Sequence, residues 1–238
     1  MAKKFRWILR LIFLVYMVYV YFAVYKQGSF YSFLLLNTFL GYIPIELAMH
    51  INSKEPKMVF WPLFIFWLLF YPNAPYVLTD LFHLAKLNPY NPLTGLMALN
   101  IKLWWNFSVL TISALGCALM GMWSLEHIAN VCAERLNKSN MATKISLIVI
   151  FNIISSFGIY IGRFLRLHTA YIFMEPSWVV RQLATMWNAK MLMFVILIFL
   201  VQMTVWGSME IYRLALSKRQ IVKFKLNILV DRKTHKGL

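Results

Sequence analysis

The stretch that decides the fold reads Y-P-N-A-P-Y-V-L-T-D-L-F-H, residues 71–83. It follows an apolar, aromatic run long enough to enter a bilayer, and interrupts that run with two prolines and an asparagine. Proline removes a backbone donor and clashes with the preceding helical turn, so we expect a helix break at Pro72–Pro75. Lipid tolerates broken backbone and ionisable side chains only where protein or trapped water satisfies them. Asp80 and His83 therefore mark a candidate site.

The composition of the whole chain indicates a membrane protein. Of the 238 residues, 61% are hydrophobic and 13% are charged, about half the charged share of an ordinary soluble domain. About 20 apolar residues cross the hydrocarbon of a bilayer, and the chain has several stretches near that length. These predict an all-α polytopic transmembrane helix bundle of about six spans, with the third broken at the Pro-Asn-Ala-Pro motif. The expected spans cover approximately 1–25, 30–49, 58–72, 99–123, 145–166 and 190–212.

The basic residues indicate how the bundle is oriented. The net charge is +16, but no nucleic-acid-binding motif accompanies it, so we expect no nucleic acid partner. Lys and Arg collect on cytoplasmic segments of membrane proteins. With the N-terminus inside, 17 of the 24 fall on the cytoplasmic side and 7 outside. This predicts a cell-membrane protein with both termini in the cytoplasm. Residues 1–212 form one integral membrane domain, and 213–238 form a basic cytoplasmic tail that meets anionic membrane lipids.

In this orientation, the polar residues that follow the break lie toward the outer face. Asn73 is placed to cap a short new helix. On an α-helix, Tyr76, Asp80 and His83 follow the spacing i, i+4 and i+7 and share a face. Asp80 and His83 are three apart, so their side chains can touch.

The fifth span brings basic residues to the same end. It closes in G-I-Y-I-G-R-F-L-R-L-H, residues 158–168, which places Arg163 and Arg166 on one helical stripe and His168 just beyond. Guanidinium groups suit carboxylates and phosphates, which they bind bidentately.

The fourth span enters from the same side and carries Asn106 near its start. Further along, Ser113, Cys117 and Gly121 are four residues apart, a spacing of small residues that predicts close helix packing.

These residues admit three interpretations. Asp80 neutralises Arg163 or Arg166 and holds the third and fifth spans together, or the arginines reach lipid phosphates with no substrate involved. In the third, the polar residues form one pocket that binds an anionic group. Its expected members are Asn73, Tyr76, Asp80, His83, Asn106, Arg163, Arg166 and His168.

Two kinds of chemistry are open to such a pocket. Asp80 and His83 are the catalytic candidates, with Asp80 orienting His83 as a general base or acid. Asp80, His83 and His168 also have the chemistry of metal ligands. The spacing D-x-x-H occurs often by chance, however, so we expect no bound metal and no cofactor.

At these motifs the sequence resembles a bacterial membrane family of unknown function, domain of unknown function 1361. The resemblance covers most of Trp7 to Tyr212 through the order and spacing of the spans. Its motifs are Pro72-Asn73-Ala74-Pro75-Tyr76, Thr79-Asp80-Leu81, His83-Leu84, Gly158-Ile159-Tyr160 and Gly162-Arg163-Phe164-Leu165-Arg166. The resemblance implies a multi-pass membrane protein and no assigned reaction.

The chain departs from this family in two places. Members usually follow the second arginine with a Trp-Asn-Ser-Trp-Asp-like run, where this chain has residues Leu167 to Tyr171. They also tend to carry an aspartate near the start of the fourth span, where this chain has Asn106. The absence of two carboxylates from the outer rim favours a binding or structural role over catalysis.

The sequence thus predicts an integral membrane protein whose outer-side polar pocket binds an anionic envelope component or supports a membrane partner. A lipid head group or an envelope precursor are the expected ligands. Two alternatives stay open. One is a membrane enzyme acting on a lipid-linked phosphate or ester. The other is a small-solute transporter, favoured by polar residues such as Asn37 and Asn152 that reach the midplane.

Overall fold

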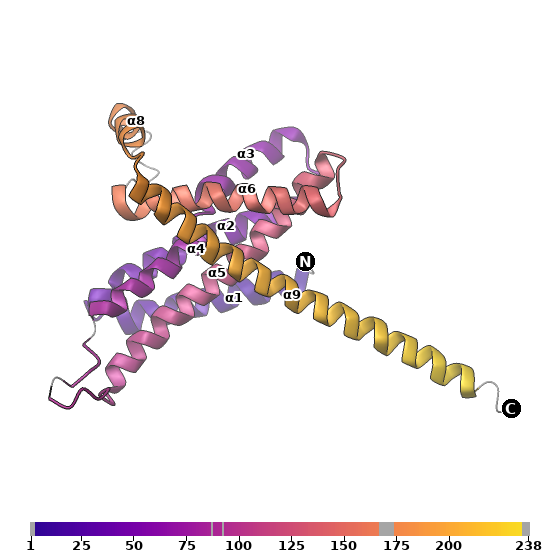
Figure 1. The fold of residues 1–238 in the computed structure, drawn as a ribbon, viewed down its shortest axis with the longest axis horizontal. Coiled ribbons are helices and arrows are strands. Elements are labelled where there is room, and N and C mark those ends of the chain that lie inside the picture. Colours follow the sequence, from indigo (N-terminus) through magenta and orange to yellow (C-terminus); the bar gives the residue numbers. More distant parts are fainter. Residues whose placement is uncertain (1–2, 87, 92, 167–173, 235–238) are drawn as a thin grey trace.

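The structure is a computed structural model that describes residues 3–86, 88–91, 93–166 and 174–234, with side chains described through Ser217. Its elements are helical, and Figure 1 labels the α-helices among them. They are α1 (Lys3–Val20), η1 (Tyr21–Tyr25), η2 (Phe30–Ser32), α2 (Phe33–His50), α3 (Lys57–Phe70), α4 (Asn73–Tyr76), η3 (Val77–Lys86), α5 (Ile101–Arg135), α6 (Met141–Tyr160), η4 (Ile161–Leu165), α8 (Pro176–Thr185) and α9 (Ala189–Thr234).

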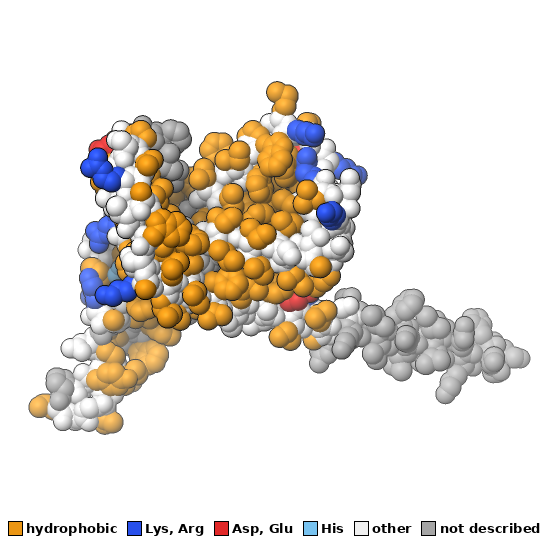
Figure 2. Space-filling view, turned by 45° about the horizontal axis from the view of Figure 1, so that its top comes forward, with side chains coloured by type: hydrophobic (Ala, Val, Ile, Leu, Met, Phe, Trp, Pro, Cys, Tyr) orange, Lys and Arg blue, Asp and Glu red, His pale blue; other side chains and the backbone are white. Residues whose placement is uncertain are grey.

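Within the part of the chain that the structure describes, six helical stretches are long and apolar enough to cross a membrane. They cover Lys3–Tyr25, Phe30–His50, Lys57–Lys86, Ile101–Arg135, Met141–Leu165 and Ala189–Ser217. Hydrophobic side chains cover much of the face of the bundle seen in Figure 2. The all-α, six-span prediction is confirmed, and the length and composition of the helices indicate an integral membrane protein.

The last helix departs from the sequence-based boundaries. α9 runs without interruption from Ala189 to Thr234, through the position where we expected a separate tail to begin. Figure 1 shows its C-terminal part extending beyond the bundle. The short helix α8, between the fifth and sixth spans, was not anticipated.

The central helix is α5, which packs against α2, α4, η3, α6 and α9. It has 35 residues and continues about twelve residues past the end expected at Trp123. Its polar last turns are held by the connection between α2 and α3. The His127 ring lies 2.8 Å from the carbonyl oxygen of Ile51, and the Arg135 guanidinium donates to the carbonyl of Glu55.

The predicted break in the third span is present. α3 ends at Phe70 and α4 begins at Asn73. Since Pro75 lacks an N–H, the Tyr71 carbonyl accepts from Ala74 instead, at 3.1 Å, and Phe70 loses its usual helical partner. The Asn73 side chain donates to the Phe70 carbonyl at 3.0 Å. The expectation that Asn73 caps the new helix is therefore wrong: its amide replaces a helical hydrogen bond that the prolines remove.

Glycines of two other helices lie directly against the break. A Cβ at Gly121 of α5 would lie 2.6 Å from the Cβ of Ala74. A Cβ at Gly158 of α6 would lie 2.6 Å from Cγ of Pro72. Both distances are shorter than any real contact, so these positions admit only glycine while the backbone stays in place.

Helix α2 is the third helix that packs against the break. A Cβ at Gly41 would lie 3.3 Å from the carbonyl oxygen of Asn73 and 3.0 Å from Sγ of Cys117. Ser113, one turn earlier on α5, accepts a hydrogen bond from Thr38 of α2 at 3.3 Å. The predicted seam of Ser113, Cys117 and Gly121 is confirmed as the place where α5 meets α2 and the break.

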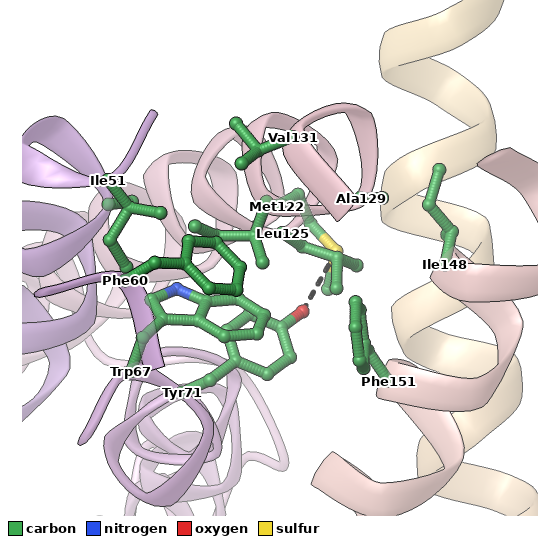
Figure 3. Packing of buried hydrophobic residues seen from close by; sticks show 12 residues of the cluster. Ile51, Phe60, Trp67, Tyr71, Met122, Leu125, Ala129, Val131, Ile148 and Phe151 are labelled. Carbon is green, nitrogen blue, oxygen red and sulfur yellow. Dashed lines mark hydrogen bonds between the residues drawn. The ribbon is translucent and has the colours of Figure 1, made fainter. Parts of the chain in front are cut away.

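An aromatic cluster fixes the chain just before the break (Figure 3). Trp67 and Tyr71 are fully buried and stack with ring centroids 4.9 Å apart. Phe151 of α6 meets Trp67 edge-on at 5.5 Å. The Tyr71 hydroxyl lies 3.6 Å from Sδ of Met122 and 3.2 Å from the side-chain oxygen of Asn152. Tyr71 therefore anchors the break to both α5 and α6.

This packing predicts opposite effects for one substitution at two positions of α5. Gly121→Ala forces a methyl group onto Ala74, and overpacking of this kind costs about 1–3 kcal/mol of unfolding free energy. Gly116→Ala is the matched control, because nothing lies within 4 Å of its added Cβ and alanine favours a helix over glycine by about 1 kcal/mol. Thermal midpoints in detergent should fall for Gly121→Ala and not for Gly116→Ala. Equal midpoints for the two variants would contradict the packing.

Candidate functional site

The segment that follows the break is a 3₁₀-helix, η3, where the sequence predicted an α-helix. Two side chains form hydrogen bonds to backbone carbonyl oxygens that would accept from backbone N–H groups in an α-helix. The Thr79 hydroxyl donates to the Tyr76 carbonyl at 2.7 Å, and Nδ1 of His83 lies 3.0 Å from the Asp80 carbonyl oxygen. With three residues per turn, Asp80 and His83 share a face but Tyr76 does not. The expected i, i+4, i+7 face therefore does not form.

Asp80 is the centre of the candidate site. It is fully buried, and each carboxylate oxygen has a partner from another span. Asn37 of α2 donates to Oδ2 at 2.7 Å, and Arg163 of η4 donates to Oδ1 at 3.3 Å. A buried carboxylate needs such partners. Of the three interpretations, the ion pair between the third and fifth spans is confirmed, with Arg163 as the partner.

The Arg163 guanidinium is held by more than this ion pair. Its Nη1 also lies 3.4 Å from the Tyr76 hydroxyl, and its Nη2 donates to the Thr79 carbonyl at 3.2 Å. Tyr76 thus joins the cluster through Arg163, although it lies off the face of Asp80. The Arg163 side chain keeps 21% of its surface exposed. Within the described part of the chain, its Nε–H donates to no group.

His83 is oriented by backbone and not by the Asp80 carboxylate. Its Nδ1 is 3.9 Å from Oδ1 of Asp80 but 3.0 Å from the Asp80 carbonyl oxygen. Its ring packs against Phe33 of α2, with centroids 4.3 Å apart. The two side chains lie within ion-pair distance, but the carboxylate–imidazole hydrogen bond that we expected for acid–base chemistry is not formed, and Asn37 and Arg163 hydrogen-bond to the carboxylate instead.

Three predicted members do not join the cluster. Asn73 instead donates to the Phe70 carbonyl at the break. Asn106 is buried on α5 and makes no hydrogen bond through its side chain among the described residues. Arg166 is exposed and adopts a left-handed backbone, with φ of 52°. It follows the π-helix η4, whose wider turn ends the α-helical stripe that was expected to align Arg166 with Arg163.

His168 lies outside the described residues. The hypothesis of a metal site that includes His168 therefore stays a prediction. Among the residues that are described, no three His, Cys, Asp or Glu side chains lie close enough to hold a metal ion.

Sequence reasoning missed the role of Asn37. It was noted only as a polar residue near the midplane, whereas it makes the shortest hydrogen bond to Asp80. An asparagine within an apolar helix is a signal that a buried partner exists. It does not identify the partner, which lies 43 residues away in the chain.

Comparison with known proteins places the chain in a family. The model of the family described as Protein of unknown function (DUF1361) matches residues 36–205, most of the chain. The chain belongs to the DUF1361 family. The match includes the break, Asn37, Asp80 and Arg163, so the resemblance found from the motifs is confirmed. No curated protein and no solved structure matches the chain.

For this DUF1361 member, the two partners of the ion pair should differ in their effect on stability. Arg163→Gln leaves the buried Asp80 carboxylate uncompensated, a loss of about 3–5 kcal/mol. Asp80→Asn costs less, because the arginine that loses its partner still reaches solvent. The double variant should lose less than the two single losses combined, as expected for groups in contact.

The control for this measurement is Arg166→Gln. Arg166 is exposed and has no ion-pair partner among the described residues, so its loss should change stability by no more than about 0.5 kcal/mol. The coupling is tested by comparing the thermal midpoints of all four variants in the same detergent. Simple additivity of Asp80→Asn and Arg163→Gln would refute the coupling.

Proposed function

We propose that this integral membrane protein binds an anionic group of an envelope component, such as a lipid head group, where η3 meets η4. The observation that carries the proposal is the state of Arg163. Asp80, Tyr76 and Thr79 hold its guanidinium in one orientation, yet a fifth of the side chain is exposed and Nε–H is free of described partners. A donor that is already oriented loses little freedom when it binds a ligand.

The charge at this end of the bundle supports an anionic ligand. In the orientation that we propose, the outer segments carry seven Lys and Arg residues against two acidic residues, Asp80 and Glu175. Since Arg163 compensates the charge of Asp80, the remaining basic groups, Arg166 among them, leave a net positive field. Such a field concentrates anions.

The same geometry favours binding over catalysis. The Asp80 carboxylate is engaged by Asn37 and Arg163, so it is not available to raise the basicity of His83. Removal of Asp80 from these partners would leave a buried charge without compensation.

The orientation of the bundle belongs to the proposal. With 17 of 24 basic residues on one side, we place both termini in the cytoplasm of a cell membrane and the η3–η4 end outside. Residues 213–238 are then a basic segment on the cytoplasmic side, where it meets anionic lipids and leaves the binding site to the outer leaflet.

Cysteine labelling tests this orientation in a background with Cys117→Ala and Cys132→Ser. Arg181→Cys, on exposed α8, should react with a membrane-impermeant maleimide on intact cells. Ser139→Cys, in the exposed turn between α5 and α6, should react only after the membrane is opened. The reverse pattern would refute the orientation.

A water-soluble head group tests the binding site itself. Glycerol phosphate should raise the thermal midpoint of the detergent-solubilised protein, whereas glycerol should not, because a ligand stabilises the state that binds it. Arg163→Lys should lose the shift, since an ammonium cannot replace the planar fork of guanidinium donors. Lys26→Gln, directly after η1, should keep it. A wild-type protein that responds equally to glycerol and glycerol phosphate would end the proposal.

A further inference from the structure

The loop between η3 and α5 projects from one end of the bundle (Figure 1), and its composition is unusual for an exposed segment. Residues 88–100 contain no charged side chain, yet several large apolar groups are exposed there. These are Tyr90 at 58%, Leu93 at 94%, Leu96 at 70%, Met97 at 51% and Leu99 at 88%. Apolar groups gathered in this way mark a surface that meets another apolar phase or partner.

The backbone of this loop forms its own hydrogen bonds. Tyr90 and Met97 form an antiparallel bridge, and the Asn91 N–H donates to the Leu96 carbonyl at 2.9 Å. The Asn91 side chain accepts from the N–H of Leu93, also at 2.9 Å. Internal pairing of backbone groups lowers the cost of leaving water, which is the condition for entering a membrane interface.

An apolar pocket of about 230 Å³ lies between this loop and the helices beside it. Its lining contains none of the polar residues of the Arg163 cluster. It consists of Leu84 from η3, Pro89, Met97 and Ala98 from the loop, and Leu103, Trp104 and Phe107 from α5. A cavity without polar groups does not hold water well, so an apolar chain is the occupant that fits it.

Basic residues flank the loop on both sides. Lys86 ends η3 and Lys102 lies in the first turn of α5, and both are exposed. Nζ of Lys86 lies 4.0 Å from the ring centroid of Phe30, which holds its charge at this end of the bundle. Trp104 lines the pocket and is 43% exposed, an arrangement typical of tryptophan at the lipid–water interface.

We propose that residues 88–91 and 93–100 lie in the interface of the adjoining leaflet, and that the pocket beneath takes one acyl chain of an anionic phospholipid. Its phosphate meets Lys86 and Lys102. The two helices that the loop connects are both candidate membrane spans, so lipid is present at this boundary without a protein partner. The site is separate from the Arg163 cluster and does not rest on the function proposed for that cluster.

Fluorescence quenching tests the position of the loop. A bimane label on Leu93→Cys, in the background without native cysteines, is reconstituted in vesicles of phosphatidylcholine and phosphatidylglycerol. We expect quenching by lipids brominated on the acyl chains and protection from aqueous iodide. Ser139→Cys is the control and should show the opposite pattern. Iodide quenching of the Leu93 label, or protection from both quenchers as at a protein interface, would overturn the proposal.

Native mass spectrometry tests the pocket. Wild-type protein should retain one phosphatidylglycerol in preference to phosphatidylcholine. Ala98→Trp fills the pocket and should lose that lipid, whereas Ala85→Trp, exposed on η3 and absent from the lining, should retain it. Changing Lys86 and Lys102 to Gln should abolish the preference for the anionic lipid. Equal retention by Ala98→Trp and Ala85→Trp would overturn the pocket assignment. The glycerol phosphate response of Ala98→Trp should stay intact, which separates the two sites.

Discussion

The contact between the break in the third span and the glycines around it is the constraint on which the rest of the structure depends. Pro72 and Ala74 lie so close to Gly158 and Gly121 that neither glycine has room for a methyl group. Such contacts let helix backbones approach where lipid offers little hydrophobic drive for association. The break therefore packs between α5 and α6 where these helices meet. Helix α2 contacts the break through Gly41.

The polar cluster follows from this packing. Once the break is fixed, η3 leaves it in one direction and presents Asp80 to α2 and η4. Asn37 and Arg163 then satisfy a carboxylate that would otherwise be costly in the bundle. Because Asp80 uses both oxygens in this way, it orients the Arg163 guanidinium and leaves His83 to a backbone carbonyl. This arrangement is the basis of our proposal that the site binds an anion.

The sequence predicted the elements whose signals are local, and it failed where the signal depends on the fold. Span count, the break and the Ser113–Gly121 seam follow from hydropathy, prolines and residue spacing. The 3₁₀ form of η3 does not, because side-chain bonds from Thr79 and His83 compete with the α-helical ladder. The position of Arg166 was missed because a π-helical turn changes the register after Ile161. The pairing of Asn37 with Asp80 was not predicted, because residues that pair between different spans have no fixed separation in the sequence.

A rescue experiment tests the central packing most directly. Gly121→Ala places a methyl group 2.6 Å from the Cβ of Ala74, but the next atom of Ala74 is 3.8 Å away. Removing the Ala74 methyl group should therefore relieve the clash. The account predicts that Ala74→Gly combined with Gly121→Ala has a higher thermal midpoint in detergent than Gly121→Ala alone, even though glycine by itself is unfavourable in the short helix α4. A double variant whose losses simply add would contradict it.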